Sequence, residues 1–455
     1  MSSFSINKGL NLRLFGAPTA ELAEVAATGT VAVQPGVFAD IKPRLDVKEG
    51  DTVRRGSVLF HDKQNPALKF RSPAAGNVES IVYGARRAID RIVIRADTKD
   101  EAEPLRRFAA GKIPGLKRED VLAHLVDTGF LALIRQRPFG HIARTDAVPK
   151  SIFVNAMNTA PFRPDANLVV RGREPAFQAG LDVLTRLTSG KVHLCIPDRS
   201  DLSPALAKAG NVETHTFKGP HPAGTTSVHI YNIDPLKPHD IVWTANADDV
   251  CLIGQLFIEG ALPATRIVTL AGPGVRDAAR KHYRVRIGTP VAALTRDRLG
   301  PGELRVVAGD VLSGAKAGPD AVLGFYDTAV TVLAENRERH FLGWLAPGLN
   351  TFSVSRTCLS RWLRPGAEWP LDTNKHGGNR AMVLTGLYEK YVPMNIMVDY
   401  LLRAVIAHDT DEAVKLGILE TLPEDYALCS LVCPSKTDVM GIVDRGLQEI
   451  EKEGI

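Results

Sequence analysis

The sequence predicts a multidomain protein of mixed α/β and α+β class, and three observations support this prediction. The chain has 455 residues, which is too long for a single hydrophobic core. Short β patterns alternate with glycine and proline turns between residues 40 and 95, whereas strand and helix patterns alternate from residue 150 onward. The C-terminal end is helical in pattern. We therefore expect four domains, at residues 1–103, 104–262, 263–335 and 336–455.

The first domain is expected to be a small antiparallel β module. Glycines at positions 50, 56 and 76, with Pro73, punctuate short apolar segments. This spacing resembles the hammerhead β fold of biotinyl- and lipoyl-type domains, in which a lysine at a hairpin tip carries the cofactor. Lys63 falls near that tip, but Asn65 and Pro66 make the hairpin irregular. We favour a scaffold module over a cofactor carrier.

The second domain is expected to be a doubly wound α/β domain. It begins with a helical stretch at 104–135, and strand and helix patterns then alternate. Strands are predicted at 152–154, 192–196 and 212–217, and helices at 175–190, 203–209 and 250–258. Because parallel neighbours need a crossover between them, this order predicts parallel strands.

The third domain is β-rich in pattern, and the fourth is mostly helical. Strands are predicted at 266–270, 283–287, 303–308 and 329–333, and a final amphipathic helix at 438–452. Residues 267–274 look like a strand that enters a dinucleotide-binding loop. However, Asp277 replaces the third small residue, and 281–287 reads as a strand where a phosphate-binding helix should begin. We expect no nucleotide site there.

Composition and patterning exclude several classes of protein. The net charge is only +5, and basic residues are interspersed with acidic ones, so no nucleic-acid surface is expected. The N-terminal residues lack a signal-peptide pattern, and no apolar run reaches the roughly 18–20 residues that span a bilayer. Five cysteines fit free thiols in a reducing compartment.

The cysteine pair near the C-terminus resembles part of an iron–sulfur motif. Cys429-x-x-x-Cys433-Pro434 matches the tail of the bacterial cluster-binding run, which needs four thiolates. The two earlier cysteines of that run are missing, and Cys358 lies far away in the sequence. We interpret the motif as a vestige and expect neither a cluster nor another metal site.

Six segments spread over the chain carry a family resemblance: Asn7-Lys8-Gly9-Leu10-Asn11-Leu12, Phe70-Arg71-Ser72-Pro73-Ala74-Ala75-Gly76, Arg135-Gln136-Arg137-Pro138-Phe139, Gly219-Pro220-His221-Pro222-Ala223-Gly224, Leu342-Gly343-Trp344-x-x-Pro347-Gly348 and Leu428-Cys429-x-x-x-Cys433-Pro434. Together they resemble one family, the A subunits of the sodium-pumping NADH:quinone oxidoreductases (Na⁺-NQR). Wider relatives are the C subunits of Rnf complexes and the flavin-binding subunit of respiratory complex I. The resemblance implies that the third domain is a β-grasp-like (SLBB) module.

The resemblance implies a peripheral subunit of a respiratory complex on the cytoplasmic side of the bacterial inner membrane. Its partners would be integral membrane subunits and flavoprotein subunits. Together these partners would carry FMN, FAD and a 2Fe–2S cluster and would transport sodium. The flavin-binding relatives have a glycine-rich loop where this chain has one glycine in 135–141, and an acidic run where 155–160 has no carboxylate. We therefore expect no flavin and no covalent cofactor on this chain.

The function that we expect is a contribution to the quinone-reducing end of the complex, with ubiquinone as substrate. A quinone head needs flat apolar walls and one or two hydrogen-bond donors. No residue is assigned a catalytic role. A scaffold that only supports assembly and a stand-alone flavoprotein or carrier enzyme remain alternatives. The candidate quinone contacts are Phe38, Arg137, Pro138, Phe139, His141, His221 and Gly224.

Overall fold

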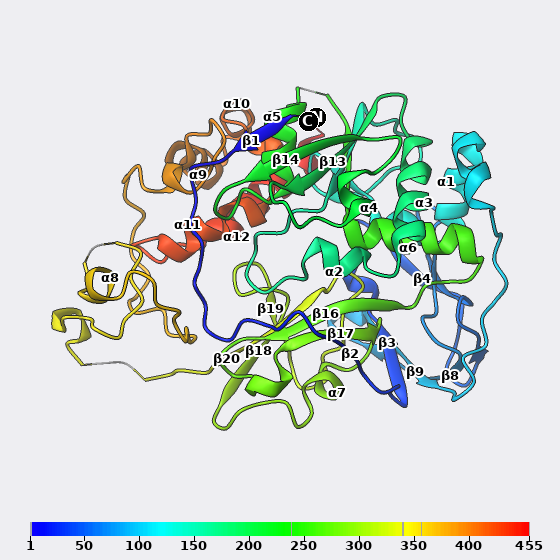
Figure 1. Cartoon of the computed structure of the whole chain (residues 1–455), viewed down its shortest axis with the longest axis horizontal. Coiled ribbons are helices and arrows are strands. Elements are labelled where there is room, and N and C mark those ends of the chain that lie inside the picture. Colours follow the sequence, from blue (N-terminus) through cyan, green and yellow to red (C-terminus); the bar gives the residue numbers. More distant parts are fainter. Residues whose placement is uncertain (1, 238, 339–340, 356, 455) are drawn as a thin grey trace.

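The computed structural model describes residues 2–237, 239–338, 341–355 and 357–454, and its strands form four sheets. Figure 1 shows the largest sheet in the upper part of the molecule, with a second sheet below it and the N-terminal β module at the lower right. The C-terminal helices lie at the upper left, beside a lobe with little regular structure. The structure is therefore a multidomain protein of mixed sheets and helices, as predicted.

The N-terminal module consists of two small antiparallel sheets, as the turn pattern predicts. Fully buried Leu59, Phe60, Ile92 and Ile94 form its core. One sheet has the order β3 (Thr30–Val33), β9 (Ile89–Ala96), β8 (Gly76–Tyr83) and β5 (Thr52–Val53), and the other has the order β4 (Pro43–Leu45), β6 (Val58–Asp62) and β7 (Lys69–Arg71).

The largest sheet has seven strands, and its parallel strands confirm the prediction from the alternating pattern. The order is β1 (Ser3–Ser5), β14 (Glu213–Lys218), β13 (Lys191–Pro197), β12 (Ser151–Asn155), β15 (Val242–Asn246), β10 (Arg135–Arg137) and β11 (His141–Ile142). The first five are parallel, and β10 runs antiparallel to β15. Pattern analysis did not reveal β1, which carries the N-terminal residues to the edge of this sheet.

Helices cover both faces of this sheet. Alternate residues of β12 point in opposite directions, so Ile152 and Val154 join the core under α3 (Glu174–Thr185) and α6 (Ala247–Glu259). Phe153 joins the core under α5 (Thr226–Ile233) instead. Shorter helices are α1 (Arg118–Thr128), α2 (Ala166–Val170) and α4 (Pro204–Ala207). The predicted helical stretch at 104–135 is helical only in part, since 3₁₀ turns at Ala110–Gly115 and Phe130–Leu133 flank α1.

The second large sheet has six strands and contains the four that the sequence predicts for the third domain. Its order is β19 (Ala315–Lys316), β18 (Leu304–Ala308), β20 (Ala329–Ala334), β16 (Thr265–Ala271), β17 (Lys281–Arg286) and β2 (Leu22–Glu24). A short helix, α7 (Val291–Thr295), packs on it. Between β16 and β17 the chain forms only a 3₁₀ turn at Asp277–Ala279, and a strand follows at the place where a dinucleotide phosphate would need an α-helix.

The C-terminal region is helical only from α9 (Val398–Ile406) onward, whereas the described part of 341–397 contains one short α-helix, α8 (Ser360–Leu363). The prediction of a mostly helical domain from residue 336 is therefore wrong for this segment. The last helix packs as predicted. The apolar stripe of α12 (Val439–Glu453) is buried in one core with three other helices of this region. These are α9, α10 (Thr410–Lys415) and α11 (Ala427–Val432). Among the described residues, no helix has both the length and the apolar character that crossing a bilayer requires.

Candidate functional site

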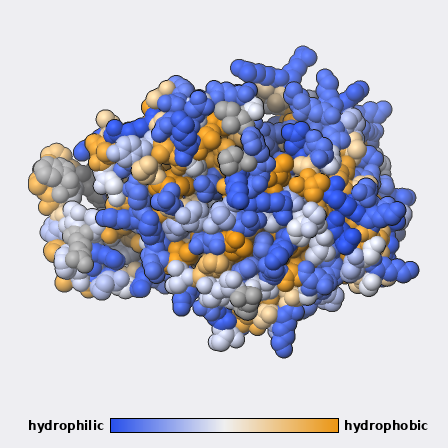
Figure 2. All heavy atoms as spheres, turned by 90° about the horizontal axis from the view of Figure 1, so that it is seen from above, coloured by the Kyte–Doolittle hydropathy of each residue, from blue (hydrophilic) through white to orange (hydrophobic). Residues whose placement is uncertain are grey.

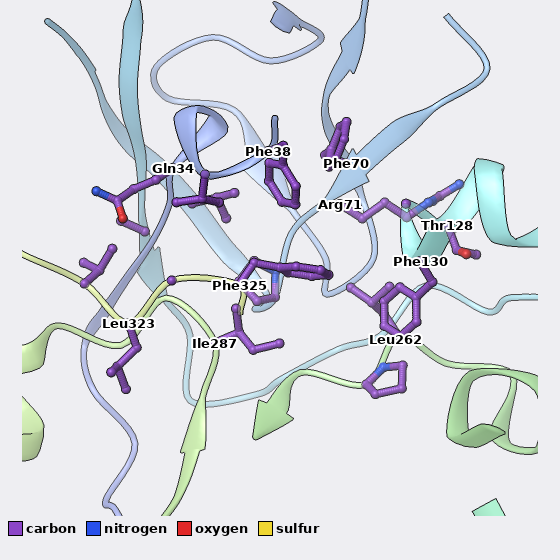
Figure 3. Close-up of a pocket in the computed structure, with 18 residues that line it drawn as sticks. Gln34, Phe38, Phe70, Arg71, Thr128, Phe130, Leu262, Ile287, Leu323 and Phe325 are labelled. Atoms are coloured by element: carbon purple, nitrogen blue, oxygen red, sulfur yellow. The ribbon is translucent and has the colours of Figure 1, made fainter. Parts of the chain in front are cut away.

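An apolar pocket lies where three parts of the fold meet. Residues of the N-terminal module, the end of α1 and the six-stranded sheet border it, and Figure 3 shows their side chains converging. The cavity volume is about 40 Å³, which is little more than the space of one water molecule. The lining includes Val37, Phe38, Phe70, Phe130, Leu262, Ile287 and Phe325.

Aromatic rings form the walls of this pocket. The ring centroid of Phe38 lies 4.3 Å from that of Phe70 and 5.1 Å from that of Phe325. Phe130 meets Phe325 edge-on at 6.5 Å. In Figure 3 the rings of Phe38 and Phe325 point toward the centre, and Gln34 lies on the side opposite Phe130. The prediction from sequence named Phe38 but not its partners, which come from distant segments.

Of the three polar side chains among the described residues that line the pocket, only one is uncommitted within the described chain. Arg71 also lines the pocket, but its guanidinium donates to Asp127 and to the carbonyl of Gly56. The hydroxyl of Thr128 donates to the carbonyl of His124. The side chain of Gln34 makes no hydrogen bond with any described residue. Its amide is therefore the group that can bind a carbonyl oxygen.

The other six candidates lie elsewhere, toward the C-terminal region. Arg137 ends β10 and is only 2% exposed, and its Nη1 donates to Ser227 Oγ at 2.9 Å. Burial lowers the pKa of Arg137, whereas the nearby carboxylates of Asp425 and Glu424 act in the opposite direction. Pro138 follows through a cis peptide bond. Arg137 is thus a buried cation facing acids of the C-terminal region.

His141 connects three parts of the chain. Its Nδ1 lies 3.1 Å from Asp40 Oδ2 in the N-terminal module, and its Nε2 lies 3.1 Å from Glu451 Oε1 in α12. The ring of Phe139 stacks on it with a centroid separation of 5.5 Å, and Phe139 also packs against the C-terminal core. Both ring nitrogens of His141 therefore already have carboxylate partners.

His221 and Gly224 lie beyond the carboxyl end of β14, as expected. His221 is 6% exposed, and its Nδ1 lies 3.0 Å from Thr159 Oγ1. Burial lowers its pKa, while Asp310 and Asp425 oppose that shift. A Cβ at Gly224 would collide with the backbone of Met157, so close packing explains this glycine. Sequence analysis missed Asp310 and Asp425, because no local motif connects them to His221.

The N-terminus of α6 holds the chain's own carboxylates. Asp248 and Asp249 are buried there, and Arg266 donates to both, at 2.9 and 2.6 Å. Arg173 also donates to Asp248, at 2.7 Å. Helix N-termini at the ends of parallel strands are common phosphate sites. Here two carboxylates occupy that position, so the residues present do not fit a flavin phosphate.

The C-terminal cysteines and Lys63 have ordinary surroundings. Cys429 and Cys433 are buried, and the Tyr388 hydroxyl donates to Cys433 Sγ at 3.0 Å. In the described ranges no third cysteine, histidine or acid joins them within ligand distance, so this pair does not fit a four-thiolate cluster. Lys63 is exposed in the loop between β6 and β7.

Comparisons with known proteins connect this architecture to one group of sequences. The chain matches the NqrA N-terminal barrel-sandwich hybrid domain over residues 4–97, the NqrA second alpha/beta domain over 116–262 and the NQRA C-terminal domain over 267–318. It is 41% identical to the A subunit of the Na(+)-translocating NADH-quinone reductase from Pasteurella multocida, over 99% of this chain and all of that one.

Other relatives give the same result. The corresponding protein from Saccharophagus degradans is 41% identical over 99% of both chains, and that from Vibrio alginolyticus is 39% identical over 99% of this chain and 100% of its own. A chain of an NAD+-reducing [NiFe]-hydrogenase is 13% identical, covers 78% of this chain and 67% of its own, and has a TM-score of 0.40. The last likeness is too weak to carry an argument.

Proposed function

Because this chain belongs to the NqrA family, the A subunits of the Na(+)-translocating NADH-quinone reductases, we propose that it supplies a quinone-binding pocket to the quinone-reducing end of such a complex. Family membership makes the chain one component of a sodium-pumping oxidoreductase complex. The quinone role rests on a single observation, the aromatic pocket at the junction of three parts of the fold.

The chemistry of the pocket supports a quinone head as the ligand. Phe38, Phe70, Phe130 and Phe325 offer flat apolar walls, and Gln34 offers an amide donor to a carbonyl oxygen. The cavity is too small for a ring as it stands. Binding therefore requires one wall to turn aside, and Phe38 follows a short 3₁₀ turn that ends at Val37.

We assign the remaining candidates a supporting role. Arg137, Pro138, Phe139 and His141 meet the C-terminal region, and His221 and Gly224 pack against the segment after β12. Each polar side chain among them has a partner inside the chain. These residues hold the C-terminal region against the seven-stranded sheet, and Phe38 with Gln34 contacts the quinone.

Cofactors and partners complete the proposal. The two aspartates at α6 and the isolated pair of thiols support a chain without its own flavin or iron–sulfur cluster. FMN, FAD and the 2Fe–2S cluster then belong to partner subunits, and this chain binds integral membrane and flavoprotein subunits at the cytoplasmic face of the inner membrane. We also propose that residues 1–103 have the hammerhead fold, that 104–262 contain the doubly wound domain, and that 263–335 form the β-grasp-like (SLBB) module.

The lobe at 341–384 is the surface that we propose for a partner subunit. It exposes several large apolar side chains, among them Phe341 at 92%, Leu345 at 62% and Leu363 at 66%. This lobe is at the left of Figure 1, and the left end of the molecule in Figure 2 shows apolar residues at the surface. Several large apolar side chains exposed in one lobe are typical of a protein–protein contact.

The test uses the assembled complex with Phe38→Ala or Phe325→Ala. We expect the KM for a short-chain ubiquinone to rise by about tenfold, which corresponds to about 1.4 kcal/mol of lost binding. NADH oxidation with an artificial electron acceptor should remain unchanged. Phe15→Ala, outside the pocket, is the matched control. Equal loss of both activities, or no change in either, would contradict a quinone pocket at this place.

A scaffold without ligand binding is the second candidate function, and the internal partners of Arg137, His141 and His221 favour it. A photoreactive quinone separates the two. Under the pocket proposal it labels peptides spanning 29–38 and 322–326 of this chain in the complex, and excess ubiquinone prevents the labelling. Labelling confined to other subunits would contradict the quinone pocket and support the scaffold function.

A further inference from the structure

Three side chains with metal-binding atoms converge on one face of the seven-stranded sheet, away from the pocket. His193 lies on β13, and Glu213 and His215 lie on the neighbouring strand β14. His193 is the register partner of Glu213, and His215 follows two residues later, so all three point to the same face. Their ligand atoms all lie within 4.8 Å of one another.

We propose that His193, Glu213 and His215 form a binding site for a divalent metal ion of the zinc class. Imidazole nitrogen and carboxylate oxygen are ligands that Zn²⁺ accepts together. Three protein ligands leave a fourth position open for water. This site differs from the prediction from sequence, which expected no metal.

The spacing of the ligand atoms fits one small ion. Zn²⁺ binds nitrogen and carboxylate oxygen at about 2.0–2.2 Å, so two ligand atoms of a tetrahedral site are roughly 3.3–3.6 Å apart. His193 Nδ1 lies 3.1 Å from His215 Nε2 and 3.7 Å from Glu213 Oε2. The ligand atoms of His215 and Glu213 lie within 4.8 Å of each other, so an ion at the centre requires the partly exposed Glu213 carboxylate to move inward by at most about 1 Å.

The two imidazoles are prepared to act as ligands. Both rings are only 5% exposed, and Nδ1 of His193 faces Nε2 of His215 at 3.1 Å. The facing nitrogens have room for only one proton between them. The other ring nitrogen of His215, Nδ1, is buried without a hydrogen-bond partner in the described chain. The hydrogen bond between the two histidines therefore leaves one ring nitrogen of the pair unsatisfied.

Glu213 supplies the charge and the route of entry. Its side chain is 43% exposed, whereas Phe4 and Phe153 flank the two histidines, with centroid separations of 6.3 and 4.8 Å. Lys191 is paired with the other carboxylate oxygen, Oε1, at 2.5 Å and is itself 66% exposed. Oε2 thus faces the histidines and stays available to an ion that enters from solvent.

Neighbouring groups are less suited to the ion. Cys195 lies on the same face, but its sulfur is not among the ligand atoms that come within 4.8 Å of one another. A second cluster, Asp40, His141 and Glu451, also has its atoms close together. There Asp40 lies at Nδ1 of His141 and Glu451 at Nε2, each at 3.1 Å. Because the two carboxylates face opposite ring nitrogens, an ion bound at one nitrogen is far from the carboxylate at the other. Hydrogen bonding explains that cluster better than a metal.

The experiment titrates Co²⁺ into the purified full-length chain after treatment with a chelator. We expect one Co²⁺ per chain with the strong visible absorption of a four-coordinate ion, and displacement by Zn²⁺. Glu213→Gln should weaken Co²⁺ binding by about tenfold, and His215→Gln by about 100-fold or more. His141→Gln removes the ring of the second cluster, and His408→Gln removes an exposed histidine paired only with Glu449; both should bind Co²⁺ like the unmodified chain.

Circular dichroism and the Tm of each metal-free variant show whether it is folded. Glu213 is partly exposed, so Glu213→Gln keeps the test valid even if the buried histidine variants do not fold. Absence of stoichiometric Co²⁺ in the unmodified chain, or Co²⁺ binding that is unchanged in Glu213→Gln and lost in His141→Gln, would overturn the proposal. No arm depends on quinone reduction, so this result is independent of the proposed function.

Discussion

Arg266 on β16 and Asp248 at the start of α6 form a buried ion pair, in which the guanidinium donates to the carboxylate at 2.9 Å. The pair connects the six-stranded sheet to the seven-stranded one. Arg266 also reaches Asp249, and Arg173 reaches Asp248 from the opposite side. These four side chains are each at most 7% exposed, so each charge depends on the others for compensation.

Replacing Arg266 with Met should therefore destabilise the protein strongly. Two buried carboxylates lose a partner, and breaking a buried pair from one side costs about 3–5 kcal/mol. Urea denaturation followed by tryptophan fluorescence measures the change in the free energy of unfolding. Arg337→Met is the matched control, because its pair with Glu303 is largely exposed and contributes about 0–1 kcal/mol. Similar losses in the two variants would contradict a structural network at α6.

Gly224→Ala tests whether this glycine provides space for packing or for a ligand. The new Cβ would collide with the carbonyl of Met157 and approach the amide of Thr159, and both are backbone atoms that cannot rotate away. We expect a loss of about 1–3 kcal/mol in the free energy of unfolding. Gly36→Ala adds a methyl group in open space and should change little. A stable Gly224→Ala variant with impaired quinone reduction would instead return Gly224 to the quinone site.

Much of the α/β sheet could be predicted because its signals are local. Strands β12, β13 and β14 are short apolar runs separated by helical patterns, and their parallel pairing follows from the crossovers. In contrast, β1 and β2 are three-residue strands whose partners lie in distant segments. Nothing in their sequence distinguishes them from a loop.

The sites were less predictable, because tertiary contacts assemble them. Phe38 could be named as an apolar wall, yet Phe325, which packs against it, lies far away in the sequence, in the turn before β20. The carboxylate of Asp425 influences both Arg137 and His221, although no motif joins the three residues. The same holds for the histidines of β13 and β14, which are 22 residues apart and carry no recognisable metal-binding spacing.

The exposed lobe at 341–384 should be needed for assembly but not for folding. Phe341→Ser and Leu345→Ser remove large apolar groups that are 92% and 62% exposed, so the Tm of the isolated chain should change little. The amount of partner subunits that co-purifies with a tagged chain should fall severalfold. Val148→Ser, at an exposed position away from the lobe, serves as control. Undiminished recovery of partners with both lobe variants would exclude this lobe as the docking surface.

His124 should make the protein less stable as the pH falls. It lies on α1, is 8% exposed, and packs edge-on against Phe108 and Phe257 with centroid separations of 5.4 and 4.9 Å. Burial lowers the pKa of His124 to about 4, from about 6.5 in an unfolded chain. The unfolded chain therefore binds the proton first between pH 6.5 and 4. Stability is complete above pH 6.5 and decreases as the pH falls toward 4.

Replacing His124 with Phe removes this proton uptake. The free energy of unfolding should then fall less steeply between pH 6.5 and 5, by up to about 1.4 kcal/mol per pH unit. His193, His229 and His282 also have pKa values lowered by burial, so the slope becomes shallower but does not vanish. Urea denaturation at pH 7.5, 6.0 and 5.0 gives the slope, and His408→Gln, at an exposed position, should leave it unchanged. If His124→Phe keeps the full slope, His124 is protonated in the folded protein and its burial does not control the acid response.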